Sequence, residues 1–139
     1  MTSKDSTILV VEDDNIIRNL VKWCLEDEGF QTETATNGIE AIDKATEQKP
    51  DLVLLDLGLP LLDGEEVAAR LHQLYGDQLP IIVVSADNDA KKKARSMGAT
   101  MCLAKPFDLD ELVKTVRGVL AQVYKAAQNP NWKAQERPI

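Results

Sequence analysis

Reactive polar side chains stand directly after short apolar runs in this sequence of 139 residues. Glu12 and Asp13 follow one run, Asp56 and Ser85 end two others, and Lys105 follows a weaker one. Neighbouring carboxylates repel one another unless a cation lies among them, and a small set of oxygen ligands with room for water suits Mg²⁺. With a lysine and a hydroxyl nearby, they would form a phosphoryl-transfer site, in which a carboxylate can itself be the nucleophile.

The joint pattern, rather than any single residue, supports this prediction. An Asp at the end of a strand is usually a turn residue or a helix cap when it is considered alone. We assign Asp14 to that ordinary class, as the N-cap of the helix that follows it. For the other polar positions, chance alone would have to repeat the same placement at four of the five predicted strand ends.

The apolar runs before these residues have the character of buried parallel strands. The three strong runs are continuously apolar and rich in Val, Ile or Leu, which is typical of strands covered on both faces. Two further runs are weaker, and in one of them Phe30, Thr32 and Thr34 alternate with polar neighbours. The predicted strands cover 8–11, 30–35, 52–55, 81–84 and 100–104.

Helical periodicity fills the intervals between the predicted strands. Gly29 and Gly98 stand where C-terminal caps would end two helices, Pro50 limits a third, and Asp63 is a predicted N-cap. The apolar stripe of the first helix includes Leu20 and Cys24, and that of the second begins at Ile39. The five stripes cover 17–25, 39–45, 67–74, 90–97 and 109–123.

Five strands alternating with five helices predict an α/β fold. The expected architecture is a doubly wound, flavodoxin-like (βα)5 unit, with a five-stranded parallel sheet in the order 2-1-3-4-5 and helices on both faces. In that order the first and third strands flank the point where the strand order reverses, and such sheets bind ligands at their carboxyl edge. Glu12, Asp13 and Asp56 are therefore expected to share one crevice.

The composition argues against several classes of function. The 23 acidic residues exceed the 16 basic ones, giving a net charge of -7, which disfavours direct contact with nucleic acid or an anionic membrane surface. No apolar run approaches the roughly 18 residues of a transmembrane helix, and carboxylates come too early for a signal peptide. Cys24 and Cys102 provide no metal-binding spacing and no disulfide framework, so a reduced, cytoplasmic location is expected.

Motifs spread along the chain resemble the receiver domains of two-component response regulators. The likeness spans residues 7–123, and it depends on the motifs as a set rather than on any one of them. The matching segments are ILVVEDD at 8–14, LLDLGLPLLDG at 54–64, PIIVVSA at 80–86, Gly98-Ala99 and KPF at 105–107.

This resemblance implies an acceptor and a metal site. Asp56 matches the phosphoacceptor of the family. Asp13 matches the direct Mg²⁺ ligand, Glu12 the neighbour that contacts the metal through water, and Gly58 the residue that offers its backbone carbonyl. Mn²⁺ is expected to substitute for Mg²⁺.

The resemblance also implies the groups that hold the phosphoryl group. Lys105 matches the lysine that pairs with it, and Ser85 matches the hydroxyl residue that follows its oxygen and moves the adjacent loop. The bond between Lys105 and Pro106 is expected to be cis. The chain departs from the pattern at Cys102, where the family often carries Tyr or Phe as a rotamer switch, so we predict a weaker or different conformational switch.

The function implied is that of a signalling protein and not of an enzyme with a separate substrate. A histidine kinase or histidine phosphotransfer protein would donate the phosphoryl group, a change of surface would reach a protein target, and self-catalysed hydrolysis would end the signal. The receiver domain is predicted to cover 1–125, with a flexible tail at 126–139 that contains Trp132. A single-domain regulator is expected, and the alternative is a domain cut from a longer protein.

Three alternative functions fit the sequence less well. A pseudo-receiver would bind partners without phosphorylation, yet every chemical position is filled here. An aspartyl-phosphate phosphatase of the haloacid-dehalogenase type needs an Asp two residues after its nucleophile, where this chain has Gly58. A nucleotide enzyme would need a glycine-rich phosphate loop, which this sequence does not contain. The basic run 91–93 is either a solvated helix face or an output surface.

Overall fold

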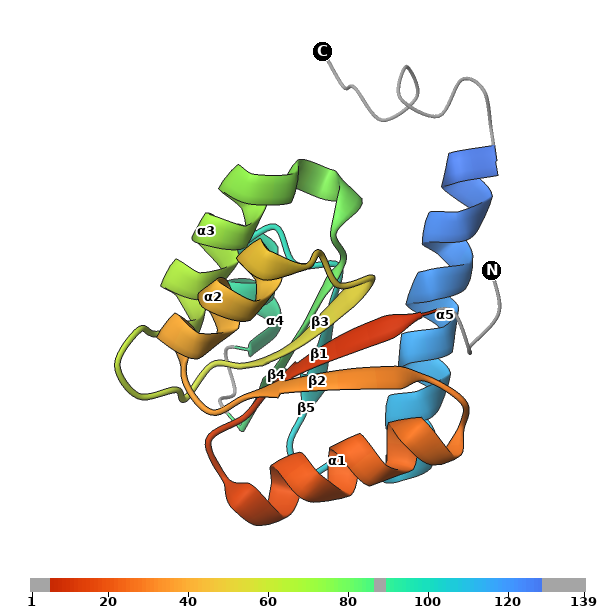
Figure 1. Ribbon diagram of the computed structural model, residues 1–139, viewed down its shortest axis with the longest axis horizontal. Helices are drawn as coiled ribbons and strands as arrows, with labels where there is room; N and C mark the ends of the chain where they lie inside the picture. The colour runs from red at the N-terminus through yellow and green to blue at the C-terminus, as the bar shows by residue number, and fades with distance from the viewer. Residues whose placement is uncertain (1–5, 87–89, 129–139) are drawn as a thin grey trace.

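The predicted strands and helices alternate as expected in the computed structural model, which describes residues 6–86 and 90–128 (Figure 1). The strands are β1 (Thr7–Val11), β2 (Gln31–Ala35), β3 (Leu52–Asp56), β4 (Ile81–Ser85) and β5 (Met101–Ala104). The helices are α1 (Asn15–Asp27), α2 (Gly38–Glu47), α3 (Gly64–Tyr75), α4 (Ala90–Ser96) and α5 (Leu109–Gln128), with a short 3₁₀ helix, η2 (Gly76–Gln78).

The strands form one parallel sheet in the order β2-β1-β3-β4-β5, which confirms the predicted topology. Successive side chains of a strand point to opposite faces of the sheet. Leu9 and Val11 of β1 accordingly pack in a core cluster with residues of α2, α3 and α4, whereas Ile8 and Val10 pack in a second cluster with residues of α1 and α5. Figure 1 shows these two groups of helices on opposite sides of the sheet.

Local capping fixes where the helices begin and end. The side chain of Asp14 accepts hydrogen bonds from the backbone N–H groups of Ile16 and Ile17, both at 2.9 Å, and Asp63 caps α3 in the same manner. Gly29 has a φ of 99° just beyond α1, a conformation that glycine adopts at little steric cost. The N-caps predicted at Asp14 and Asp63 are confirmed.

Some positions of the predicted apolar stripes are exposed, because the sheet covers a narrower face of α1, α2 and α3 than the stripes suggest. Val21 and Leu25 of α1 are buried, but Leu20 is 48% exposed. Ile39 of α2 and Leu74 of α3 are likewise 52% and 45% exposed. These side chains lie at the edges of their stripes, where the helix surface turns away from the sheet.

The last helix continues past the predicted start of the tail. The apolar stripe ends at Val123, yet α5 runs to Gln128. Ala126, Ala127 and Gln128 are good helix formers, so the backbone stays helical beyond the end of the predicted stripe. The rest of the predicted tail, 129–139, lies outside the described residues, and so does Trp132.

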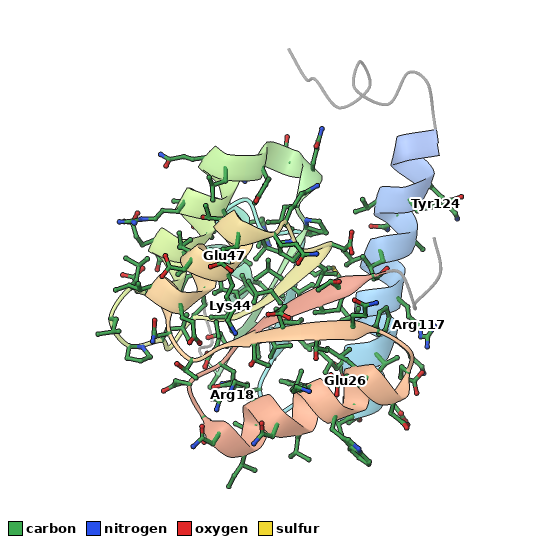
Figure 2. All side chains as sticks on the ribbon, viewed as in Figure 1. Arg18, Glu26, Lys44, Glu47, Arg117 and Tyr124 are labelled. Carbon is green, nitrogen blue, oxygen red and sulfur yellow. The ribbon has the colours of Figure 1, made fainter. Side chains whose placement is uncertain are left out.

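The middle of α5 is tied to the end of α1 on the same face of the sheet. Arg117, which Figure 2 labels on α5, donates a hydrogen bond to a carboxylate oxygen of Glu28 at 2.8 Å. Its guanidinium lies 5.5 Å from the centre of the Phe30 ring. Within residues 6–86 and 90–128, no helix is both long and apolar enough to cross a membrane.

Two glycines offer a matched test of this packing. A Cβ at Gly64 would come within 2.9 Å of Leu57 Cα and 3.2 Å of the Asp56 carbonyl oxygen, whereas a Cβ at Gly118 in α5 meets no atom within 4 Å. We expect Gly64→Ala to lower the free energy of unfolding by about 1–3 kcal/mol through overpacking. Gly118→Ala should raise it by about 1 kcal/mol. Urea denaturation measures both, and equal effects of the two substitutions would contradict the packing described.

Candidate functional site

The carboxyl ends of three adjacent strands bring the predicted polar residues together. Val11 of β1 pairs with Leu55 of β3, so Glu12, which follows Val11, stands opposite Asp56. Ser85 ends β4, the next strand. Although all three side chains are polar, Glu12 is 5% exposed, Asp56 is 7% exposed and Ser85 is 6% exposed. Polar groups are seldom buried this deeply unless they are paired or functional.

These residues line an open hollow of about 540 Å³ at this edge of the sheet, which we call the acidic pocket. It contains every site residue predicted from the sequence: Glu12, Asp13, Asp56, Gly58, Ser85 and Lys105. Asp14, Ile17, Leu57, Ala86 and Lys93 also line it, and none of these was predicted as a site residue.

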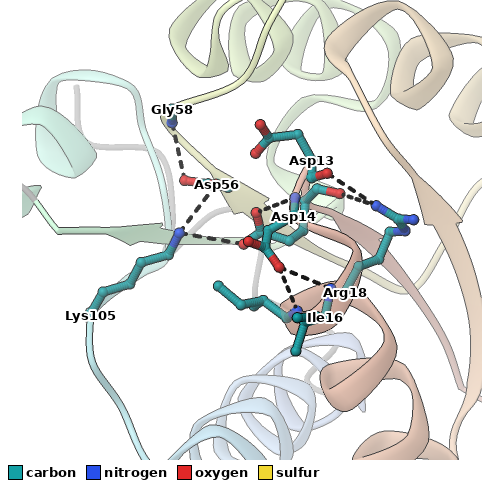
Figure 3. A network of polar contacts seen from close by, with 9 residues as sticks. Asp13, Asp14, Ile16, Arg18, Asp56, Gly58 and Lys105 are labelled. Atoms are coloured by element: carbon teal, nitrogen blue, oxygen red, sulfur yellow. Dashed lines mark hydrogen bonds and ion pairs between the residues drawn. The ribbon is translucent and has the colours of Figure 1, made fainter.

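Both oxygens of Asp56 are held by donors from the chain (Figure 3). Asp56 Oδ1 accepts the backbone N–H of Gly58 at 3.0 Å, and Asp56 Oδ2 lies 3.2 Å from Lys105 Nζ. Lys105 Nζ also lies 3.4 Å from Glu12 Oε1, while Glu12 Oε2 accepts the N–H of Asp14 at 3.1 Å. One lysine therefore bridges two buried carboxylates that come from different strands.

Arg18 holds the loop that follows β1, and sequence reasoning missed it. Its Nη1 donates to the backbone carbonyl of Glu12 at 3.0 Å and to that of Asp13 at 3.4 Å (Figure 3). Its Nη2 donates to Asn15 Oδ1. The Asp13 side chain is exposed at the mouth of the acidic pocket. In the sequence, nothing separates Arg18 from an ordinary helix-surface arginine.

The burial of the site changes its acid–base chemistry. Burial raises the pKa of Glu12 to about 7, with a smaller rise from the charge of Asp56, while the hydrogen bond from Asp14 acts in the opposite direction. Burial tends to lower the pKa of Lys105, but the charges of Asp56 and Glu12 outweigh it, so the Lys105 pKa is raised. Lys105 is therefore a cation at neutral pH.

The three carboxylates fit a hard metal ion. Glu12, Asp13 and Asp56 each offer one oxygen, and these oxygens all lie within 4.8 Å of one another. Oxygen ligands of this kind, two of them buried and one open to water, suit a divalent cation that keeps part of its hydration shell. The sequence predicts that these three carboxylates share one crevice, and the structure brings them together.

Two further predictions concern the last strand and the turn after it. The bond between Lys105 and Pro106 is cis, as expected. Cys102 of β5 is half-buried and packs against the core cluster on the side of α2, α3 and α4, where burial raises the pKa of its thiol. No aromatic ring stands at that position, and the altered switch inferred from this departure stays a prediction.

Comparison with known proteins assigns the chain to a family. The sequence profile of the response regulator receiver domain matches residues 8–117, and the chain belongs to this family of two-component signalling domains. Sporulation initiation phosphotransferase F of Bacillus subtilis (strain 168) is 37% identical over 115 residues, which cover 81% of this chain and 92% of that protein. Response regulator MprA of Mycobacterium sp. (strain KMS) is 39% identical over 115 residues. The match covers 50% of that protein, so the chain spans about half the length of the MprA relatives.

Solved structures support the same assignment. The chemotaxis response regulator CheY4 of Vibrio cholerae is 32% identical with a TM-score of 0.75, and the match covers 82% of this chain and 98% of that one. A CheY-like receiver domain protein from Methanospirillum hungatei JF-1 is 27% identical with a TM-score of 0.81, covering 86% and 97% of the two chains. The resemblance and the fold predicted from the sequence are therefore confirmed.

Proposed function

We propose that this chain accepts a phosphoryl group on Asp56 from a phosphohistidine donor and signals through the resulting change of its surface. The observation that supports this most directly is the buried Asp56 carboxylate, which lies between the Gly58 N–H and the Lys105 ammonium at the floor of an open pocket. The chain would act on itself, as a signalling phosphoacceptor, rather than as an enzyme with a separate substrate.

The proposed reaction is an in-line displacement at phosphorus. An oxygen of Asp56 forms the new P–O bond, the P–N bond of phosphohistidine breaks, and the donor imidazole leaves. The Gly58 N–H fixes Oδ1, which leaves Oδ2 as the attacking oxygen. Lys105, now 3.2 Å from Oδ2, would turn its ammonium to an oxygen of the incoming group, and Ser85 would donate its hydroxyl to another.

The metal belongs to the same proposal. Glu12, Asp13 and Asp56 would hold Mg²⁺, with the backbone carbonyl of Gly58 as a further ligand. When bound, the ion would offset the negative charge of the carboxylates and of the transferring group. The chain itself supplies the nucleophile, the lysine and the fixed N–H donor, so positioning these groups is its main contribution.

The direct test is labelling with a small phosphodonor. Incubation with acetyl phosphate and Mg²⁺ should add the mass of one phosphoryl group to the intact chain, in an adduct that is stable in acid and labile in base. Chelation of the metal with EDTA should suppress the labelling. If no adduct forms at any Mg²⁺ concentration, the chain binds its partners without phosphorylation, and the proposal fails.

An exposed apolar row on α1 is suited to the phosphodonor protein. Ile16, Leu20 and Trp23 are 73%, 48% and 66% exposed, and their spacing places them on one face of the helix. The start of α1 adjoins the acidic pocket, because Ile17 lines it. Exposed apolar side chains that adjoin one another on a surface are typical of protein interaction sites. We propose that a kinase or phosphotransfer protein packs a helix on this row while its phosphohistidine reaches Asp56.

Truncating a side chain of this apolar row should slow phosphoryl transfer from a protein donor and leave transfer from a small phosphodonor unchanged. We expect Trp23→Ala to slow transfer from a phosphotransfer protein that labels the wild type by roughly thirtyfold, as removal of an interface hot spot does. Labelling by acetyl phosphate should not change. Tyr124→Ala is the matched control, since Tyr124 is 43% exposed, does not line the pocket and lies on α5 well away from Arg18 of α1 (Figure 2). Equal transfer rates for Trp23→Ala and Tyr124→Ala would exclude α1 as the docking helix.

The raised pKa of Glu12 predicts pH-dependent metal binding. Below pH 7 the metal-free site holds a proton on Glu12 that must leave when Mg²⁺ binds. The Mg²⁺ affinity should therefore fall roughly tenfold between pH 8 and pH 6. Calorimetric titration measures it, and Glu12→Gln should remove most of the pH dependence. An affinity that is independent of pH in the wild type would contradict the assignment.

The raised pKa of Glu12 affects the stability of the metal-free chain in the opposite direction. The Mg²⁺ affinity rises with pH, whereas the free energy of unfolding falls. Between pH 4.5 and about 7 the folded state holds a proton that the unfolded chain has released, because the Glu12 pKa is raised from 4.5. The contribution of Glu12 to the free energy of unfolding is then lost as the pH rises through this window.

A further inference from the structure

The three consecutive lysines of α4 lie in different surroundings. Lys91 and Lys92 are exposed, whereas Lys93 is half-buried and lines the acidic pocket that contains Asp56. Ala94, the next residue, is buried in the core against the sheet. The short helix therefore sets Lys93 apart from its two neighbours and places it on the wall of the pocket.

More carboxylates than lysines line the acidic pocket. Lys105 is already engaged by Glu12 and Asp56. Phosphorylation would convert the single charge of Asp56 into a dianionic acyl phosphate, in a pocket where part of the water is excluded and charges interact strongly. The charged residues that line the pocket are Glu12, Asp13, Asp14, Asp56, Lys93 and Lys105.

We propose that Lys93 is a second phosphoryl-binding cation, which pairs with an oxygen of the phosphoryl group on Asp56 from the side of α4. This inference rests on the proposed function. It adds a consequence of its own, because Lys93 belongs to α4 and Lys105 follows β5, so the phosphoryl group would connect two separate elements. Such a link would couple α4 to the state of Asp56 without an aromatic side chain at Cys102.

Beryllofluoride, which mimics a phosphoryl group on aspartate, provides the probe. Calorimetric titration at saturating Mg²⁺ would compare the full wild-type chain with Lys93→Gln, and Lys92→Gln would serve as the matched control on the exposed neighbour. We expect Lys93→Gln to weaken beryllofluoride binding roughly five- to tenfold, Lys92→Gln to have no effect, and Lys93→Arg to restore binding to within about twofold.

Binding of Mg²⁺ without fluoride distinguishes charge pairing from damage to the site. Loss of a positive charge should leave the Mg²⁺ affinity of Lys93→Gln unchanged or increased, whereas a structural defect would weaken both ligands. The inference is overturned if Lys93→Gln binds beryllofluoride as Lys92→Gln does, or if it loses Mg²⁺ and beryllofluoride affinity together. If the wild type itself does not bind beryllofluoride, the proposed function fails along with it.

Discussion

Replacing Asp56 by Asn should abolish labelling by acetyl phosphate and Mg²⁺, with a loss of at least about a hundredfold in the initial rate. The amide has nearly the shape of the carboxylate, and its oxygen can still accept the Gly58 N–H, but it is not a nucleophile at phosphorus. The buried surroundings of Asp56, which is 7% exposed, should therefore stay folded. Intact-mass analysis over time gives the rate.

A second Asp to Asn change controls for the substitution itself. Asp63 caps α3 through the backbone N–H of Glu66, and Asn caps helices about as well as Asp does. Asp63→Asn should therefore be labelled at the wild-type rate. Labelling of Asp56→Asn at a rate close to that of Asp63→Asn would mean that a different carboxylate accepts the phosphoryl group.

Replacing Lys105 by Ala should slow labelling by roughly 10²–10³-fold, the range seen when one donor to a developing anion is removed. Lys105 Nζ is the cation that now bridges Asp56 at 3.2 Å and Glu12 at 3.4 Å. Without it, the chain has lost the ammonium that would follow the negative charge to the phosphoryl oxygens. Amide chemical shifts of the adduct should also change less than in the wild type, because the link from the phosphoryl group to β5 is gone.

Metal binding gives a second signature of the same variant. Glu12 and Asp56 are both buried, so Lys105→Ala leaves two neighbouring carboxylates without their cation. We expect Lys105→Ala to melt at a lower temperature than Lys114→Ala, which removes a lysine from α5. Adding Mg²⁺ should also raise the melting temperature of Lys105→Ala by more than that of Lys114→Ala. Wild-type labelling and an unchanged signalling response in Lys105→Ala would contradict the role assigned to this lysine.

The topology and most of the element boundaries could be predicted because the strand signals are strong. Runs such as Leu52–Leu55 and Ile81–Val84 are apolar throughout and buried throughout, so only a sheet covered on both faces suits them. The sequence predicts the positions of the helices along the chain more accurately than it predicts which helix faces are buried. Periodicity gives the direction of an apolar face but not its width, and Leu20 and Ile39 fall just outside the width that the sheet covers.

The site could be predicted where it depends on strand ends, and not where it depends on helix rotation. Glu12, Asp56, Ser85 and Lys105 stand at or directly after strand ends, so the order of the sheet places them together. Arg18 and Lys93 reach the site from helices, and the sequence does not say which exposed-looking cation turns inward. The raised pKa of Glu12 was also beyond prediction, because it depends on how much water the fold excludes.

The most direct test of this account is to locate the phosphoryl group on the chain. After labelling with acetyl phosphate and Mg²⁺, borohydride reduction converts an aspartyl phosphate into homoserine, and peptide mass spectrometry identifies the residue that has changed. The account predicts homoserine at position 56 and no reduction product at Glu12 or Asp13, which share the acidic pocket. A product at either of those residues, or none anywhere in the chain, would contradict it.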